Sequence, residues 1–136
     1  MPSTITVIDE FPSGGDAARF ELEFPAETVT ARELIRSRVY QEVDDYNRRV
    51  RSGTAPDYRG LVTPEEAGAP AARAGRQPPK REIDWKKQFD TACDAFQKNQ
   101  IIVLVGERQV EGLDEVITLT RGLEVTFLKL TPLVGG

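Results

Sequence analysis

The stretch TITVIDEFPSGGDAARFELEF, from Thr4 to Phe24, decides how the chain begins to fold. Its first part, Thr4–Phe11, is rich in β-branched residues, which favour extended strands. Pro12–Asp16 (PSGGD) has the composition of a turn, and Ala18–Phe24 (ARFELEF) alternates apolar and charged residues with the period of a half-buried strand. The stretch therefore predicts a β-hairpin at the start of the domain.

A long amphipathic helix is predicted directly after this hairpin, over about residues 31–51. Thr30 and Glu33 have the spacing of a capping box, in which the two side chains satisfy free N–H groups at a helix start. Apolar residues then recur at helical spacing. They are Leu34, Ile35, Val39, Val43, Tyr46 and Val50.

The middle of the chain changes in composition. Gly53–Lys80 carries most of the prolines together with many alanines and glycines, and it shows no sustained periodicity, so we predict an irregular insertion over residues 53–81. Order returns over residues 82–97, where apolar residues share one stripe and predict an inserted helix. The stripe consists of Trp85, Phe89, Ala92, Cys93 and Phe96.

Three further strands are expected in the last third of the chain. The segment IIVLVGERQVEG predicts a buried strand, a turn near Gly106–Arg108 and a short return strand, and GLEVTFLKL (Gly122–Leu130) predicts a final strand. The order of elements indicates one α+β domain over residues 1–136, with a mixed sheet packed on the long helix. Residues 131–136 are predicted to form an exposed C-terminal tail.

Composition argues against several classes of function. The chain has a formal net charge of −4, which disfavours nucleic acid and anionic membranes as partners. It contains no histidine and a single cysteine, so the usual general base, the commonest metal ligand and an intramolecular disulfide are all missing. We expect a cytoplasmic protein that is not an enzyme, binds no metal or cofactor, and contacts neither nucleic acid nor membrane.

Taken in order, these segments resemble the ubiquitin family of β-grasp proteins. The hairpin with ETVTARELIRSRV is similar to the opening hairpin and capped helix of that family, QIIVLVGERQVEGLDEV to its strand, turn and short strand, and GLEVTFLKLTPLVGG to its last strand and tail. The resemblance covers about two-thirds of the chain and omits roughly residues 50–96. It implies a β-grasp fold with an inserted loop and extra helix, as expected of a divergent, bacterial relative.

The resemblance implies that the C-terminal Gly135-Gly136 is the reactive end of a protein modifier. A partner activating enzyme would use ATP to adenylate the carboxylate of Gly136 and pass it on as a thioester. Transfer to a target amine would then form an isopeptide bond. A conjugating enzyme, a deconjugating protease and target proteins are the further partners implied. Glycines lack Cβ and can enter a narrow channel, while Pro132 stiffens the base of the tail.

Two alternatives remain open at this point. Pro132, Leu133 and Val134 make the base of the tail apolar, which is closer to the small sulfur carriers of molybdopterin and thiamine synthesis, whose C-termini become thiocarboxylates. The chain could instead be a non-covalent β-grasp interaction module, with the insertion as its binding element. Fold alone does not distinguish these functions.

A partner would also need a surface. If Val125 and Phe127 face the core, Leu128 and Leu130 point outward. Alternation likewise turns either Val103 and Val105 or Ile102 and Leu104 outward, and by resemblance Val103, Leu128 and Leu130 form the candidate partner-binding surface. The second helix could equally cover these residues as core. The possible acceptor lysines for chain formation are Lys80, Lys86, Lys87, Lys98 and Lys129.

Overall fold

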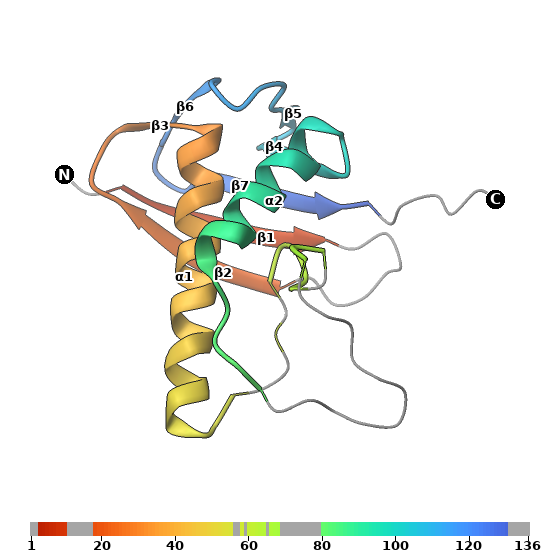
Figure 1. Ribbon diagram of the computed structural model, residues 1–136. Coiled ribbons are helices and arrows are strands. Elements are labelled where there is room, and N and C mark those ends of the chain that lie inside the picture. Colours follow the sequence, from red (N-terminus) through yellow and green to blue (C-terminus); the bar gives the residue numbers. More distant parts are fainter. Residues whose placement is uncertain are drawn as a thin grey trace. The chain divides into compact units, whose positions relative to one another are not determined.

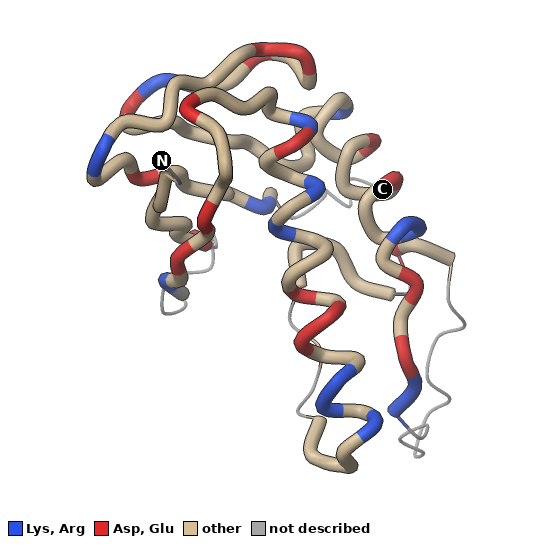
Figure 2. The backbone as a smooth tube through the Cα atoms, turned by 90° about the vertical axis from the view of Figure 1, so that its left-hand side faces the viewer, with Lys and Arg blue, Asp and Glu red and all other residues tan. Residues whose placement is uncertain are grey.

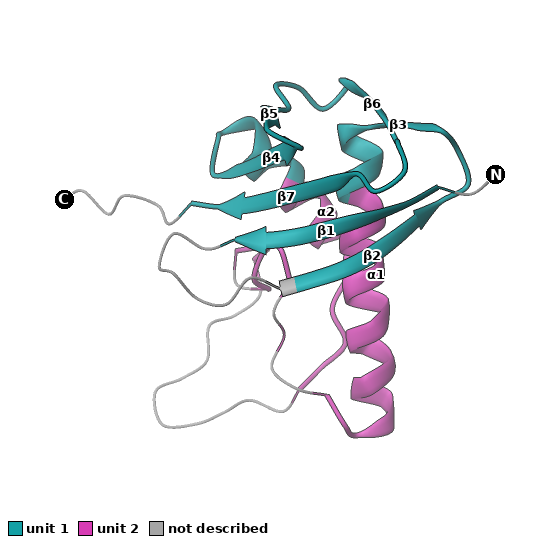
Figure 3. Cartoon of the chain, turned by 180° about the vertical axis from the view of Figure 1, so that it is seen from behind, with its two compact units in different colours: residues 1–35, 93–136 teal, residues 36–92 magenta. Residues whose placement is uncertain are grey.

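The computed structural model shows an α+β fold that divides into two compact units (Figure 3). Unit 1 comprises residues 1–35 and 93–136, and unit 2 comprises residues 36–92. The structure describes residues 3–10, 18–55, 58, 60–64, 66–68 and 80–130, with the side chain of Ala18 left out.

Unit 1 is built on a mixed five-stranded sheet with the order β2-β1-β7-β4-β5 (Figure 1). The strands are β1 (Ser3–Glu10), β2 (Ala18–Phe24), β4 (Ile101–Val105), β5 (Arg108–Gln109) and β7 (Glu124–Lys129). Strand β7 is central, because it pairs in parallel with β1 and antiparallel with β4. The first and last strands of the chain are therefore neighbours in the sheet.

The predicted hairpin strands and the return strand are confirmed. Strands β1 and β2 pair antiparallel from Ser3↔Phe24 to Asp9↔Ala18, while the predicted turn at Pro12–Asp16 lies outside the described residues. Strands β4 and β5 also pair antiparallel and are joined by Gly106 and Glu107. Gly106 has a φ of 61°, in the left-handed region that glycine adopts without strain because it lacks a Cβ atom.

Helix α1 (Ala31–Ser52) begins in unit 1 with the predicted cap. The backbone N–H of Glu33 donates to the Thr30 hydroxyl at 3.2 Å, and that hydroxyl donates to the Glu33 carboxylate at 3.1 Å. The N–H groups of Ala31 and Arg32, which have no partner inside the helix, donate to the carbonyls of Glu115 and Leu113. The segment before β6 thus fixes where α1 starts.

A second, two-stranded sheet was not predicted from the sequence. Strand β3 (Thr28–Thr30) pairs antiparallel with β6 (Val116–Thr118), and the pair buries Val29 and Ile117. Each strand has only three residues, too few to show the alternation that marks a strand in sequence. Their pairing places the start of α1 beside the segment that satisfies its free N–H groups.

Helix α2 (Trp85–Gln97) ends in unit 1 with a left-handed residue. Asn99 has a φ of 61°, its N–H donates to the carbonyl of Phe96, and the N–H of Gln100 donates to the carbonyl of Ala95. This pair of hydrogen bonds is a Schellman motif, which satisfies carbonyl groups of the last turn and ends the helix. Strand β4 follows at once.

One face of the unit 1 sheet forms the core. The helical residues of this unit lie on that side of the sheet, behind the strands in Figure 3. Buried side chains on the core face of the strands include Ile5, Val7, Leu22, Phe24, Ile101, Val103, Val125 and Phe127, and those of the helices in this unit include Ala31, Leu34, Ile35, Ala95 and Phe96.

Unit 2 contains the remainder of α1, the described part of the insertion and the first part of α2. Between Ser52 and Trp85 the described residues form turns and irregular segments, without a helix or strand. Side chains of α1 hold this segment. Asn47 accepts the N–H of Ile83 at 2.7 Å and donates to its carbonyl at 2.9 Å, and Arg51 pairs with Glu82 at 2.8 Å. On α1 itself, the Asp44 carboxylate and the Arg48 guanidinium form an ion pair one turn apart. The acidic and basic residues of the helix appear red and blue in Figure 2.

Buried polar side chains form a cluster inside unit 2. Arg38 is 1% exposed and donates to Glu42 at 2.7 Å, and the other Glu42 oxygen accepts the N–H of Leu61. Gln88 is equally buried and donates to the carbonyl of Val62 at 2.9 Å. Burial raises the pKa of Tyr58 above its ordinary value of 10.0, and the Glu42 carboxylate raises it further.

Among the described residues, neither helix is long and apolar enough to cross a membrane.

Substituting Phe127 with alanine should strongly destabilise the protein. This side chain is 1% exposed on the central strand, so its removal leaves a cavity and should lower the free energy of unfolding by about 3–5 kcal/mol. The neighbouring Leu128→Ala change, on the other face of β7, is the matched control and should cost less. Denaturant unfolding measures both, and equal losses would contradict the assigned faces of this strand.

Substituting Tyr58 with phenylalanine should change the alkaline titration of the protein. The folded state holds the Tyr58 proton more tightly than the unfolded chain does, so its contribution to stability is complete below pH 10.0 and falls as pH rises through the folded pKa. Phenolate absorbance should therefore lose its most alkaline step in Tyr58→Phe. Loss of a step at or below pH 10 instead would show that Tyr58 is not buried.

Candidate functional site

The candidate site is the outer face of the unit 1 sheet, opposite the core, close to where β7 ends. Side chains alternate along β7: Val125 and Phe127 are buried in the core, whereas Thr126 and Leu128 lie on the other face and are half-buried. In the register of the sheet, Leu128 stands between Glu10 of β1 and Ile102 of β4. Leu128 therefore lies where the sequence places a partner surface.

Val103 does not belong to that surface. It is 0% exposed and pairs with Phe127 on the core face, so the alternation of β4 turns Ile102 and Leu104 outward instead. Both are half-buried. The sequence IIVLV is apolar at every position, and for this reason its pattern does not reveal which residues face the core.

The outer face carries an apolar patch that the sequence identified only in part. We define the apolar patch by its four side chains, Ile8, Ile102, Leu104 and Leu128. Ile8 stands opposite Thr126, which stands opposite Leu104, so the strands β1, β7 and β4 bring the patch together. Ile102 and Leu104 are the other of the two sets that the alternation of β4 allowed, and Ile8 was missed because the register between distant strands is needed to place it beside them.

Leu130, the residue that precedes the predicted tail, is anchored to the sheet. Leu130 is half-buried, and its N–H donates to the carbonyl of Gln100 at 2.8 Å, which extends the β4–β7 pairing beyond the end of the strand. The predicted tail base and reactive glycines lie outside the described residues. These are Pro132, Leu133, Val134, Gly135 and Gly136.

The five candidate acceptor lysines differ in their surroundings. Lys86, Lys87 and Lys98 are exposed on or just after α2, and Lys98 pairs with Asp94 at 2.8 Å. Lys80 is exposed and donates to the carbonyl of Ala55 at 2.7 Å, while Lys129 is half-buried in β7. Lys80, Lys86 and Lys87 belong to unit 2, whereas Lys98 and Lys129 belong to unit 1.

An ionic cluster holds the segment that follows β5. The Glu115 carboxylate accepts hydrogen bonds from the Arg108 guanidinium and from the backbone N–H of Glu111. The Arg108 hydrogen bond is the main reason that the pKa of the Glu115 carboxyl lies below its ordinary value of 4.5. Because the Glu115 carbonyl also accepts the first N–H of α1, the cluster connects the β4–β5 hairpin to the start of that helix.

The cysteine, aspartate and glutamate side chains in the described part of the chain form no group of three that could hold a metal ion. Cys93 is half-buried and forms no disulfide.

Comparison of the chain with protein-family models, with curated proteins and with solved structures gave no match.

Replacing Arg108 with glutamine should raise the pKa of the Glu115 carboxyl toward its ordinary value, since the strongest stabilisation of the carboxylate is removed. A lowered folded pKa stabilises the fold above the unfolded pKa, and this contribution is lost as pH falls through the folded value. Carboxyl-carbon NMR titration of both proteins measures the shift. An unchanged Glu115 titration in Arg108→Gln would contradict the pairing.

Proposed function

We propose that the chain is a ubiquitin-like protein modifier with a β-grasp fold, activated at the carboxylate of Gly136. The order β2-β1-β7-β4-β5, with the first and last strands parallel at its centre, is compatible with that fold and supports the proposal. The insertion at residues 53–81 and the inserted helix α2 are then additions to the fold, between α1 and β4. The cytoplasm is the compartment that suits this function.

The observation that carries the proposal is the anchoring of β7 on both sides. Strand β1 pairs with one edge and β4 with the other, and the hydrogen bond from Leu130 to Gln100 is the last of the series. Six residues separate this fixed point from the Gly136 carboxylate, and fully extended they span at most about 20 Å. A firmly held strand end, followed by a short segment that finishes in two residues without side chains, is what an activating enzyme needs to position a carboxylate.

The proposed chemistry proceeds in three steps. The Gly136 carboxylate attacks the α-phosphate of ATP, forming an acyl-adenylate and releasing pyrophosphate. A cysteine thiolate of the activating enzyme then displaces AMP to form a thioester, which a conjugating enzyme can receive. A target amine finally attacks the thioester, forming an isopeptide bond and releasing the thiol. This chain supplies the acyl group and the recognition surface, and a deconjugating protease would reverse the last bond.

The apolar patch supports the proposal because it includes Leu128, close to the end of β7. Leu130, the residue before the proposed tail, lies two residues farther along. An enzyme that holds the patch would therefore also have Leu130 within reach. Half-buried leucine and isoleucine side chains on a sheet face can anchor such a contact.

The test is to incubate the purified protein with ATP and a lysate of the organism that encodes it, and then to follow intact mass and gel migration. A modifier forms reducible thioesters and stable adducts of higher mass, and Gly136→Ala should abolish both. Gly112→Ala is the matched control, because no atom lies within 4 Å of the added Cβ and adduct formation should persist.

The other outcomes contradict the modifier. A mass rise of one sulfur-for-oxygen exchange at the C-terminus, without adducts, would identify a sulfur carrier. Absence of any ATP-dependent change would leave a non-covalent interaction module. Adducts that persist in Gly136→Ala would contradict the requirement for a residue without Cβ at the reactive end.

A further inference from the structure

The outer face of the unit 1 sheet has an acidic rim beside its apolar patch. In the row next to the patch, Glu21 of β2, Thr6 of β1 and Glu124 of β7 stand side by side, and in the following row Glu23 stands opposite Thr4. Glu10 flanks the patch on its other side, opposite Leu128. We define the acidic rim as Glu10, Glu21, Glu23 and Glu124, all of which are exposed.

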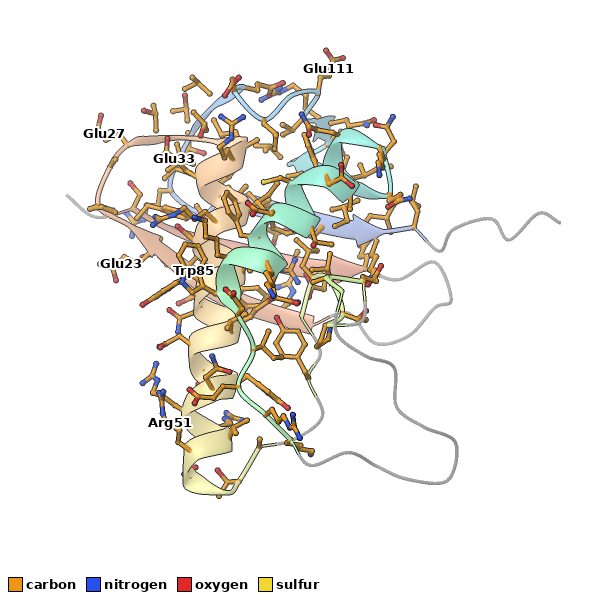
Figure 4. The ribbon with its side chains drawn as sticks, viewed as in Figure 1. Glu23, Glu27, Glu33, Arg51, Trp85 and Glu111 are labelled. Atoms are coloured by element: carbon orange, nitrogen blue, oxygen red, sulfur yellow. The ribbon has the colours of Figure 1, made fainter. Side chains whose placement is uncertain are left out.

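Positive charge on this face is limited to one side chain among the paired strand residues. Arg19, opposite Ile8, is that side chain, and its guanidinium already lies 3.4 Å from the Glu124 carboxylate. Four carboxylates against one guanidinium give the face a net charge of −3. Figure 4 shows Glu23 pointing away from the ribbon of β2. The face thus combines three half-buried apolar side chains, Ile102, Leu104 and Leu128, and the buried Ile8 with exposed, largely uncompensated carboxylates.

This combination limits what can bind. Nucleic acid and anionic lipid are repelled by the carboxylates, and a second copy would bring one acidic rim against another. A neutral apolar segment would gain nothing from the rim. A segment that places leucine-like side chains between lysines or arginines complements both parts of the face, because its apolar groups cover the patch and its cations meet the rim.

We infer that the outer face of unit 1 binds a basic protein segment in which apolar side chains are flanked by lysine or arginine. The inference rests on the proposed function, since it names the chemistry that the modifier's enzymes or readers would present to this face. Exposed ion pairs contribute mainly to the rate of encounter and to selectivity between partners. Salt screens these charges over a distance of about 8 Å at 0.15 M ionic strength, so binding should weaken as the salt concentration rises.

The test uses the purified full chain with two short synthetic peptides, one built of leucine and lysine and one with glutamate replacing each lysine. Amide shifts in an NMR titration report where each peptide binds. The lysine peptide should shift residues 8–10, 102–104 and 126–128, and more weakly at high salt, whereas the glutamate peptide should not. Leu104→Ala should weaken the lysine peptide's binding by removing part of the patch.

Matched charge variants separate a specific site from general attraction. Replacing Glu21 and Glu23 together with glutamine should weaken binding roughly two- to thirtyfold, the loss expected of two exposed ion pairs. Glu27 and Glu111, also exposed and also labelled in Figure 4, lie outside the strands of the sheet. Replacing this second pair with glutamine changes the net charge equally and should leave affinity unchanged.

Four results would each overturn the inference: equal binding of the glutamate peptide, shifts confined to other residues, equal weakening by both pairs of substitutions, or self-association through this face. Neither ATP nor an activating enzyme is present, so the result is independent of adduct formation. Peptide binding without adduct formation would contradict the proposed modifier function and support the binding surface. Adduct formation without peptide binding would support the modifier function and contradict the binding surface.

Discussion

The pairing of β7 on both of its edges is the constraint on which the rest of unit 1 depends. Strand β7 buries Val125 and Phe127 in the core and pairs with β1 on one edge and β4 on the other, so it joins segments of the sheet that are far apart in the sequence. Parallel pairing of the first and last strands requires a long crossover, and the helices and the insertion supply it. The same pairing turns Leu128 outward and fixes the point from which the last six residues depart.

Fixation of the strands determines which side chains each face of the sheet carries. Because side chains alternate, one set joins the core and the other set lies on the outer face. The outer face carries the apolar patch in the two rows that hold Leu128 and Thr126, with Glu10 in the Leu128 row and the other residues of the acidic rim in the rows beyond Thr126. The Arg108–Glu115 cluster and the capped start of α1 hold the far end of the unit without using this face.

Local signals in the sequence predicted most of the regular elements. The alternation of ARFELEF gave β2, the Thr30–Glu33 spacing marked the start of α1, and the apolar stripe from Trp85 to Phe96 placed α2 within three residues. Features set by distant contacts were missed or wrong. Strands β3 and β6 are three-residue elements that exist through their pairing, and the uniform run IIVLV concealed that Val103 faces the core. The burial of Arg38 and Gln88 likewise depends on contacts with the insertion, which their own helices do not encode.

The central claim is the parallel pairing of the first and last strands, and backbone NMR tests it most directly. Nuclear Overhauser effects should connect backbone protons of residues 6–10 with those of residues 124–128 in increasing order along both strands, with Val7 next to Val125 and Asp9 next to Phe127. Contacts running in opposite order, or β7 contacts with β4 alone, would contradict this account of the fold and of the surface built upon it.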